Sequence, residues 1–284
     1  MDRIFKIVLP VVILLLVYSC KDPNEETKTI TGNENVKQET RHCADFSTVY
    51  VYDNFTVQIY KDDLYKLEME GESNLLFYIE YDINKNGVLT LKVKDNYILN
   101  PTVPITIKIF TPGTPEVVLS NSSVIYYNEV TDTKCALSLR DNSKAYFTNS
   151  NIARLNITLS NQSSVESDGL IADIVDISTV TSSKIKMRTV EFNTATITSQ
   201  SAGDAFFTGT CNNANLNIKN SGDIDAKDMT ISNCTISIGS SGNIYAHVTN
   251  TLEGVINGSG NLYLKGNVNT DKVIIKSTGR IIPL

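Results

Sequence analysis

From about residue 116 to the C-terminus, hydrophobic and polar residues alternate in short stretches that are separated by turns of small residues. The clearest examples are "NSGDIDAKD", "GSSGNIYAH" and "NGSGNLYLKG", which begin at Asn220, Gly239 and Asn257. Each contains a Ser-Gly turn, an Asp or Asn, and then an aliphatic residue that opens the alternation. Alternation with a period of two is typical of a β-strand with one buried face. We therefore expect short strands that recur along the chain.

The same turn recurs with a period of 18–21 residues. Aligning the chain on the aliphatic residue after each turn gives one column of Val124, Ala145, Val165, Ile185, Ala205, Ile224, Ile244, Leu262 and Ile281. Two positions earlier every residue is Ser or Gly, namely Ser122, Ser143, Ser163, Ser183, Gly203, Gly222, Gly242, Gly260 and Gly279. A fixed period of this length indicates a fold built from repeated structural units.

Alternation also assigns the columns to opposite sides of the predicted strands. The aligned aliphatic residue and the residue two positions later are mostly apolar, so we expect both columns to point inward. In the first unit this places Val124 and Tyr126 inside. The residues between them form a mixed outward column of Ile125, Tyr146, Glu166, Lys186, Phe206, Asp225, Tyr245 and Tyr263. About ten residues later each unit has a second alternating stretch, such as "LNITLS", so each unit contributes at least two strands.

A single unit of about 20 residues cannot bury its own apolar face, whereas stacked units share a continuous core. The sequence therefore predicts an all-β fold in which residues 116–284 form a right-handed parallel β-helix. Successive coils lie about 4.8 Å apart, which leaves little room for a side chain at the corner. This crowding explains the Ser/Gly column, and we expect Gly203, Gly222, Gly242, Gly260 and Gly279 to be structural corner residues.

Residues 45–115 have longer alternating stretches and polar turns, including the hairpin-like "KNG". Four prolines at positions 101, 104, 112 and 115 mark the boundary with the repeats. This β-rich region is either a separate cap or the first, wider coils of the helix. In both cases it would cover the N-terminal edge of the solenoid, which otherwise offers unpaired backbone groups to other chains.

The N-terminal residues have the features of an exported lipoprotein. Residues 1–19 combine a short basic segment with an apolar run from Ile7 to Tyr18, as in a signal peptide. The run ends in "LVYSC", which resembles a bacterial lipobox and predicts lipid attachment at Cys20. The alternative is an uncleaved membrane anchor. Residues 20–44 lack apolar periodicity and are rich in polar residues, so we expect a lipidated flexible tether.

Composition excludes several classes of partner. The formal net charge of −6 argues against nucleic-acid binding, which normally needs a basic surface. Cys135 and Cys234 share strand parity with core residues, so buried free thiols are the preferred interpretation over disulfides. No Cys-x-x-Cys pair or nearby histidine indicates a zinc site, and isolated Asp204 and Asp223 at coil corners do not make a calcium site. We therefore expect no metal and no cofactor.

The sequence offers little catalytic chemistry. Its two histidines, His42 and His247, do not form part of a recognisable triad. Many parallel β-helices act on polysaccharides with clustered charged residues, but Glu166, Lys186 and Asp225 fall on different coils. We therefore expect that the protein is not an enzyme, and keep a polysaccharide-acting enzyme as the alternative.

Aromatic residues in the outward column are the best candidates for a binding surface. Tyr245 and Tyr263 are predicted on neighbouring coils, and Tyr146 and Phe206 lie further along the same face. Tyr presents an apolar ring with a polar tip, which suits contact with sugar rings or with a protein. The alternative is that these rings pack against a neighbouring segment or simply favour the pleated strand.

The chain resembles the head GIN domain family, described as a putative auto-transporter adhesin and common in Bacteroidetes lipoproteins. The resemblance rests on "FSTVYVYDNFTVQIYKDDLYKLEMEGESNLLFYIEYDINKNGVLTLKV" and on the turns that begin at Gly222, Gly242 and Gly260. It covers nearly the whole chain after Cys20. It implies a β-helical fold and a location in the cell envelope.

Together these features predict an outer-membrane lipoprotein, on the cell surface or on the periplasmic side. Its β-helix would serve as a binding or scaffold domain, with adhesion to a glycan or protein surface as the leading function. A structural envelope protein that self-associates through the last coil, near Ile281, is a further alternative.

Overall fold

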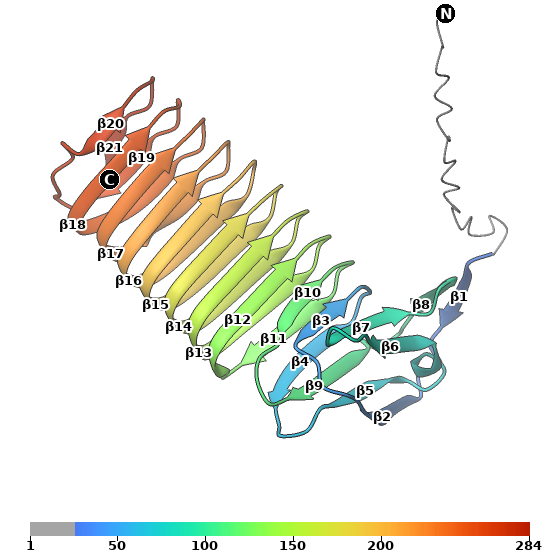
Figure 1. The fold of residues 1–284 in the computed structure, drawn as a ribbon. Helices are drawn as coiled ribbons and strands as arrows, with labels where there is room; N and C mark the ends of the chain where they lie inside the picture. Colours follow the sequence, from blue (N-terminus) through green and yellow to red (C-terminus); the bar gives the residue numbers. More distant parts are fainter. Residues whose placement is uncertain (1–25) are drawn as a thin grey trace, which may run out of the picture.

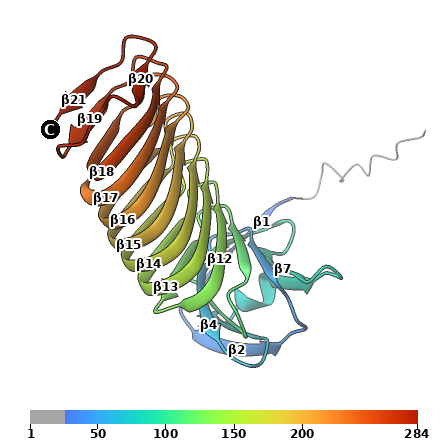
Figure 2. The ribbon, with the colours of Figure 1, turned by 60° about the vertical axis from the view of Figure 1, so that its left-hand side comes forward.

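The protein is a parallel β-solenoid of about eight turns that is closed at its N-terminal end by a cap of antiparallel strands (Figure 1). The computed structural model describes residues 26–284. Its coils stack along one axis, and the C-terminus lies at the end opposite the cap (Figure 2). The predicted fold class is therefore confirmed. The predicted signal peptide and Cys20 lie outside the described residues.

Most coils consist of one long strand that bends without losing its hydrogen bonds to neighbouring coils. The strands are β12 (Thr131–Leu139), β13 (Lys144–Leu159), β14 (Ser164–Thr179), β15 (Lys184–Ser199), β16 (Asp204–Ile218), β17 (Ile224–Ile238) and β18 (Ile244–Ile256). In β13 the alternation of buried and exposed residues is interrupted at 148–149 and again at 153–154. These interruptions divide the coil into three segments, which we call faces A (144–148), B (150–152) and C (155–159).

The inward columns of face A form continuous rows of the core, together with the inward columns of faces B and C. Parallel register aligns Ala145 with Val165, Val165 with Ile185, and so on to the last coil. Below this row, Phe147, Met187 and Phe207 are also buried. Because each row continues through the stack, apolar side chains contact like side chains above and below, which is the continuous core that the repeat predicted.

The alignment of the first repeat was wrong by one residue. Ile125, not Val124, pairs with Ala145, and Tyr127 pairs with Phe147. Tyr127 is fully buried, and its ring stacks on that of Phe147 with centroids 4.6 Å apart. Tyr126 therefore points outward. The stretch Val124–Tyr127 is apolar at all four positions, so alternation alone could not assign its faces.

The corners between faces C and A are of two kinds. In the earlier coils the corner residue is a buried serine, at Ser123 rather than Ser122, and at the equivalent positions 143, 163 and 183. Ser143 is representative, because its Oγ donates to the carbonyl oxygens of Arg140 (2.7 Å) and Leu119 (3.2 Å). The hydroxyl thus satisfies carbonyl groups of its own turn and of the preceding coil.

In the later coils the corner is the Gly-Asx-aliphatic motif. The requirement for glycine at the first position and that for Asp or Asn at the second have different physical causes. A Cβ on Gly242 would lie 2.1 Å from the carbonyl oxygen of Gly222, so only glycine fits between the coils. The Asn243 backbone N–H donates to Asp223 Oδ1 (2.6 Å), and Asn261 N–H donates to Asn243 Oδ1 (3.0 Å). The side-chain oxygen at the second position therefore accepts a hydrogen bond from a backbone N–H of the next coil.

Residues 45–115 contribute both coils and a cap, which resolves the two alternatives. The strands involved are β3 (Thr48–Val51), β4 (Thr56–Lys61), β7 (Val88–Val93), β9 (Thr106–Thr111), β10 (Glu116–Leu119) and β11 (Val124–Asn128). On face C the stacking order is β7–β3–β10, and on face A it is β9–β4–β11, all parallel. The coil formed by residues 48–61 is thus stacked between two coils that are consecutive in sequence, 88–111 and 116–128. The connection at 112–115 passes over the inserted coil.

Antiparallel strands cover the outermost coil. Strand β5 (Lys66–Glu72) pairs with β9, β2 (Val36–His42) pairs with β5, and β6 (Ile79–Ile83) pairs with β7. A separate two-stranded sheet joins β1 (Lys28–Thr31) to β8 (Tyr97–Asn100). The prediction of a flexible tether is therefore wrong for residues 28–42, which contain strands β1 and β2. These residues lack apolar periodicity because both sides of β2 are largely exposed, and the backbone pairing to β5 holds the strand.

The opposite end of the solenoid has no comparable cap in the described residues. The last coil consists of β19 (Leu262–Lys265), β20 (Val273–Ile275) and β21 (Ile281–Pro283). Ile274 and Ile275 are 58% and 45% exposed. The apolar surface of this coil is therefore only partly covered.

Cys135, Cys211 and Cys234 are buried free thiols, and Cys43 is free and half-buried. Burial raises the pKa of Cys135 and Cys234 to about 12 and that of Cys211 to about 11. The three thiols therefore remain protonated and act as small core residues, as expected.

A buried carboxylate holds the irregular connections of the cap together. Glu72 is fully buried and accepts hydrogen bonds from the backbone N–H of Glu34 (2.6 Å) and Thr102 (2.8 Å) and from Thr102 Oγ1 (2.8 Å). Burial acts to raise the pKa of Glu72, but these hydrogen bonds outweigh it and lower the pKa. The ionised carboxylate thus joins the β1–β2 connection to the segment before β9.

Replacing Gly242 with Ala should destabilise the solenoid, because the new Cβ collides with a backbone carbonyl that side-chain motion cannot relieve. We expect the free energy of unfolding to fall by about 1–3 kcal/mol, measured by denaturant titration. Gly113→Ala is the matched control, since the nearest atom to its Cβ would lie 3.8 Å away. Equal stability of the two variants would contradict the corner model.

Glu72 should make stability depend on pH. Because its folded pKa is lowered, its contribution is fully present above the unfolded value of about 4.3 and is lost as pH falls through the folded pKa. Glu72→Gln should therefore lower Tm at pH 7 and reduce the loss of Tm between pH 5 and pH 3. Glu70→Gln, at an exposed position of the same strand, is the control. A Glu72→Gln profile parallel to that of the control would refute this role.

Candidate functional site

The outward column of face A forms one continuous row along the solenoid, which we call the face A ladder. Its members, in spatial order, are Tyr126, Tyr146, Glu166, Lys186, Phe206, Asp225, Tyr245 and Tyr263, and each is in register with the next. Parallel in-register stacking sets equivalent side chains about 4.8 Å apart. The ladder is therefore a rigid array of side chains at the repeat distance of the coils.

The ladder contains two stacked aromatic pairs. The rings of Tyr245 and Tyr263 lie 4.5 Å apart and within 8° of parallel. Tyr126 and Tyr146 form the second pair, with ring centroids 5.1 Å apart and an interplanar angle of 15°. Sequence reasoning missed Tyr126, because the one-residue alignment error had placed it inside the core. Three of the four predicted aromatics, Tyr146, Tyr245 and Tyr263, therefore belong to these pairs, and Phe206 lies alone between them.

A shallow groove of about 910 Å³ surrounds Phe206. It is lined by Lys184, Ile185, Lys186, Arg188, Asp204, Ala205, Phe206, Asp223, Asp225, Lys227 and Tyr245. These residues come from β15, β16, β17 and β18, except Asp223, which immediately precedes β17. We call this groove the face A groove. It brings Phe206 and Tyr245, two of the predicted residues, into one site, whereas Tyr146 and Tyr263 are not among its lining residues.

The edge of the groove is shaped by an irregularity in β17. The register between β17 and β18 shifts between Ala226 and Thr230, so β17 has extra residues at this point. One of them, Lys227, forms an ion pair with Asp225, and its Nζ lies 5.9 Å from the centre of the Tyr245 ring. The hydrogen bond to Asp225 raises the pKa of Lys227, so the ammonium group stays charged. Because Lys227 is an extra residue outside the regular period, the repeat pattern of the sequence could not predict its position.

Three cations of β15 border the other side of the groove. Lys184, Lys186 and Arg188 alternate along one strand and are all exposed. Within residues 26–284, none of these three side chains forms an ion pair within 4.0 Å. Asp204, Asp223 and Asp225 also line the groove, and Asp204 is in register with Lys184, so an anionic ligand would meet these cations within a surface of mixed charge. Phe206 and Tyr245 supply apolar ring surface beside them. This arrangement suits a ligand with both rings and negative groups.

Burial raises the pKa of Tyr245, and the neighbouring Asp223 acts in the same direction. The phenol therefore remains neutral at physiological pH and can donate a hydrogen bond. His247 follows on the same strand and is in register with Lys265, on the outward side. In the part of the chain that the structure describes, no group of three His, Cys, Asp or Glu side chains is arranged to hold a metal ion.

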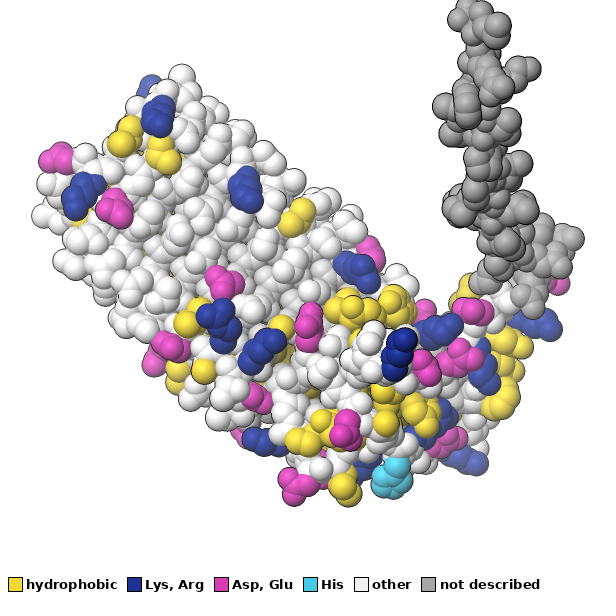
Figure 3. Space-filling view, in the orientation of Figure 1, with side chains coloured by type: hydrophobic (Ala, Val, Ile, Leu, Met, Phe, Trp, Pro, Cys, Tyr) yellow, Lys and Arg dark blue, Asp and Glu magenta, His cyan; other side chains and the backbone are white. Residues whose placement is uncertain are grey.

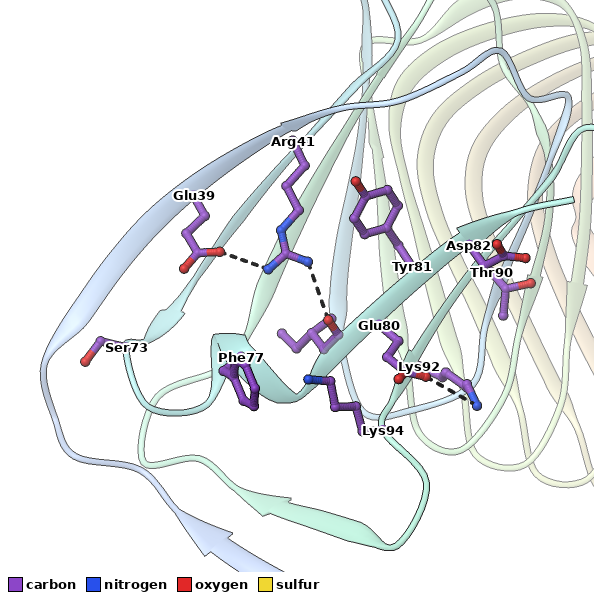
Figure 4. A pocket seen from close by; sticks show the side chains of 11 residues that line it. Glu39, Arg41, Ser73, Phe77, Glu80, Tyr81, Asp82, Thr90, Lys92 and Lys94 are labelled. Carbon is purple, nitrogen blue, oxygen red and sulfur yellow. Dashed lines mark hydrogen bonds and ion pairs between the residues drawn. The ribbon is translucent and has the colours of Figure 1, made fainter.

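A second pocket of about 490 Å³ lies in the cap, between β2 and β6 (Figure 4). Arg41 crosses it and donates to Glu39 Oε2 (2.9 Å) and to the carbonyl oxygen of Ile79 (3.4 Å). Its guanidinium also lies 5.5 Å from the centre of the Tyr81 ring. Arg41 thus joins β2 to β6, two edge strands of the cap. Sequence reasoning missed this pocket, because Glu39 and Arg41 fell within the expected tether, whereas the other lining residues fell within the β-rich region 45–115.

Comparison with protein families identifies the chain. The model of the family described as "Putative auto-transporter adhesin, head GIN domain" matches residues 45–205 and 145–268. These matches cover most of the chain, so the protein belongs to the head GIN domain family. The resemblance noted in the sequence is therefore confirmed.

Solved structures of low sequence identity share the fold. One is a putative lipid binding protein from Parabacteroides distasonis, with a TM-score of 0.65 and 20% identity over 90% of this chain and 100% of that one. Another is a putative adhesin from Parabacteroides merdae, with a TM-score of 0.59 and 20% identity over 89% and 99%. A putative adhesin from Parabacteroides distasonis has a TM-score of 0.58 and 18% identity over 90% and 100%.

The family and these relatives are described as adhesins or as a lipid binding protein, and none as an enzyme, in agreement with the expectation of a non-enzymatic protein. No curated protein matches the chain. The adhesin family indicates a surface-binding protein at the cell surface. The only helix in residues 26–284 is a three-residue 3-10 turn, so no described helix is long enough to cross a bilayer.

Proposed function

We propose that the protein is a cell-envelope lipoprotein that is anchored through Cys20 and uses its solenoid to bind a glycan or protein surface. The face A groove is the contact site in this proposal. The proposal is supported by the membership of the adhesin family and by the lipobox-like sequence before Cys20. The single observation that carries the binding function is the groove, where the rings of Phe206 and Tyr245 lie beside the exposed cations of β15.

A glycan with acidic groups fits the groove best. Phe206 offers ring surface for contact with a sugar ring, and Tyr245, one face of which is covered by Tyr263, offers its ring edge and hydroxyl group. Lys184, Lys186 and Arg188 supply charge for carboxylate or sulfate groups. The coils repeat about every 4.8 Å, so a linear polymer can make similar contacts on successive coils, and many weak contacts then add up.

Self-association through the last coil is a second candidate function. It is favoured by the exposure of Ile274 and Ile275 on β20, next to a sheet edge that has no cap among the described residues. A solution mass that rises with protein concentration would support this role, and a constant monomer mass would exclude it.

Removing a ring from the groove should weaken glycan binding. We expect Tyr245→Ala to reduce affinity for an acidic oligosaccharide about tenfold, which corresponds to ~1.4 kcal/mol. The ligand would first be selected on an array of acidic and neutral glycans, and its affinity then measured by titration calorimetry.

Tyr126→Ala provides a matched control, because it also removes one ring from a stacked tyrosine pair on face A. Both variants should lose similar stability, but only Tyr245→Ala should lose affinity. Equal affinities for the two variants, or binding of neutral and acidic glycans alike, would contradict the groove as the contact site.

Replacing Cys20 with Ala should abolish lipid attachment and release the protein from the membrane fraction, because each buried CH₂ of an acyl chain contributes about 0.8 kcal/mol. The measurements are cell fractionation and incorporation of labelled palmitate. Cys43→Ala is the control, since this thiol is half-buried in the folded chain and should not affect labelling. Persistent membrane association of a cleaved Cys20→Ala protein would refute the anchor.

Protease treatment of intact cells distinguishes the two sides of the outer membrane. Rapid digestion of the solenoid would establish display on the cell surface and support adhesion. Protection until the outer membrane is opened would instead indicate a periplasmic scaffold and contradict adhesion to external surfaces.

A further inference from the structure

An exposed aromatic group projects from the cap, beside the pocket shown in Figure 4. Phe77 is 69% exposed, although it belongs to a short 3-10 turn, η1 (Leu76–Tyr78). The preceding residues Leu75 and Leu76 are fully buried and fix the turn to the core. The exposed ring is therefore held by a rigid support.

Three further side chains gather around this ring, and we call the group of Phe77, Tyr78, Lys94 and Tyr97 the cap cluster. The ring centroids of Phe77 and Tyr78 lie 5.3 Å apart, and those of Tyr78 and Tyr97 lie 4.6 Å apart. Lys94 Nζ lies 3.6 Å from the centre of the Phe77 ring. Lys94 forms no ion pair within 4.0 Å among the described residues. The cluster thus combines apolar rings, phenol groups and one free positive charge.

The cap cluster lies next to the point where the chain enters the fold. The first residue of β1, Lys28, is in register with Tyr97, and its N–H donates to the carbonyl oxygen of Asn96 (2.9 Å). On the other side of η1, Asn74 Nδ2 donates to the carbonyl oxygen of Thr31 (2.8 Å). Hydrophobic side chains lie among both basic and acidic ones at this end of the molecule, beside the start of the described chain (Figure 3).

The ordered β1 strand shortens the link to the membrane. Only eight residue steps separate Cys20 from Lys28, and a fully extended chain spans at most about 3.6 Å per residue, or about 29 Å here. A tether that ended at residue 44 would have allowed roughly three times this distance. With a lipid on Cys20, the cap cluster is therefore kept within reach of the bilayer surface.

We propose that the cap cluster contacts the phospholipid surface in which the protein is anchored. Phe77 and the two tyrosines would lie at headgroup depth, where aromatic rings are favoured, and Lys94 would pair with lipid phosphate. The inference rests on the lipid anchor in the proposed function. The contact orients the solenoid with its cap towards the membrane and leaves the face A groove free along its side.

The chain contains no tryptophan, which permits a direct test. Phe77→Trp, Ile171→Trp and Ile274→Trp each introduce one fluorophore at an exposed apolar position, in the cap, in the middle of the solenoid and at its far end. Each lipidated protein would be reconstituted into phosphatidylethanolamine–phosphatidylglycerol vesicles with brominated acyl chains. We expect a blue shift and roughly twofold quenching at position 77, and neither at the two control positions. An unquenched fluorophore at 77 in lipidated protein would overturn the proposal.

A second measurement separates this proposal from the anchor itself. Residues 21–284 without lipid retain every residue that the structure describes, and their Phe77→Trp emission can be titrated with the same vesicles. A blue shift that weakens several-fold with added salt or with Lys94→Glu supports the contact, whether or not Cys20 is lipidated in cells. If unlipidated protein shows no shift and lipidated protein is equally quenched at 77 and 171, the cluster has no specific membrane contact. Failure of lipidation would be detected separately, by the mass of Cys20-containing protein.

Discussion

The whole structure depends on the parallel, in-register hydrogen bonding of one coil on the next. This pairing fixes the spacing of the coils, so each position of the repeat becomes a row of side chains along the solenoid. The inward rows of all three faces form the core, and the outward row of face A forms the face A ladder. The same spacing demands glycine at Gly242, where the carbonyl of Gly222 leaves no space for a Cβ.

The chemistry of the candidate site arises where this regular pairing is interrupted. A strict repeat would give a flat ladder, whereas the register shift in β17 brings Lys227 beside Tyr245 and forms one edge of the groove. The exposed cations of β15 lie across Phe206 from this edge. The stack of coils makes these side chains rigid, and the irregularity creates the concave surface. The two ends of the solenoid also differ, since antiparallel strands cover the N-terminal coil and, among residues 26–284, none covers the last coil.

The outward orientation of Tyr146, Phe206, Tyr245 and Tyr263 could be predicted because alternation and a constant period define it. The same reasoning failed at Val124–Tyr127, where four apolar residues in succession leave the face undefined. It also failed for 28–42, since an exposed edge strand such as β2 has no apolar pattern and is stabilised by backbone pairing to β5. Lys227 was not predicted because a bulge breaks the period that the prediction used.

The sequence by itself determined the parallel coils, their period, the residues at the corners and the identity of the core rows. These features are local and repeated, so composition and spacing are sufficient to define them. Only the tertiary structure decided the order of the first coils, the antiparallel cap, the groove and the cap cluster. Each of these depends on contacts between segments far apart in the chain, as when 48–61 inserts between 88–111 and 116–128. Such pairings are selected by the shared core and by backbone hydrogen bonds, which leave no periodic signal in the sequence.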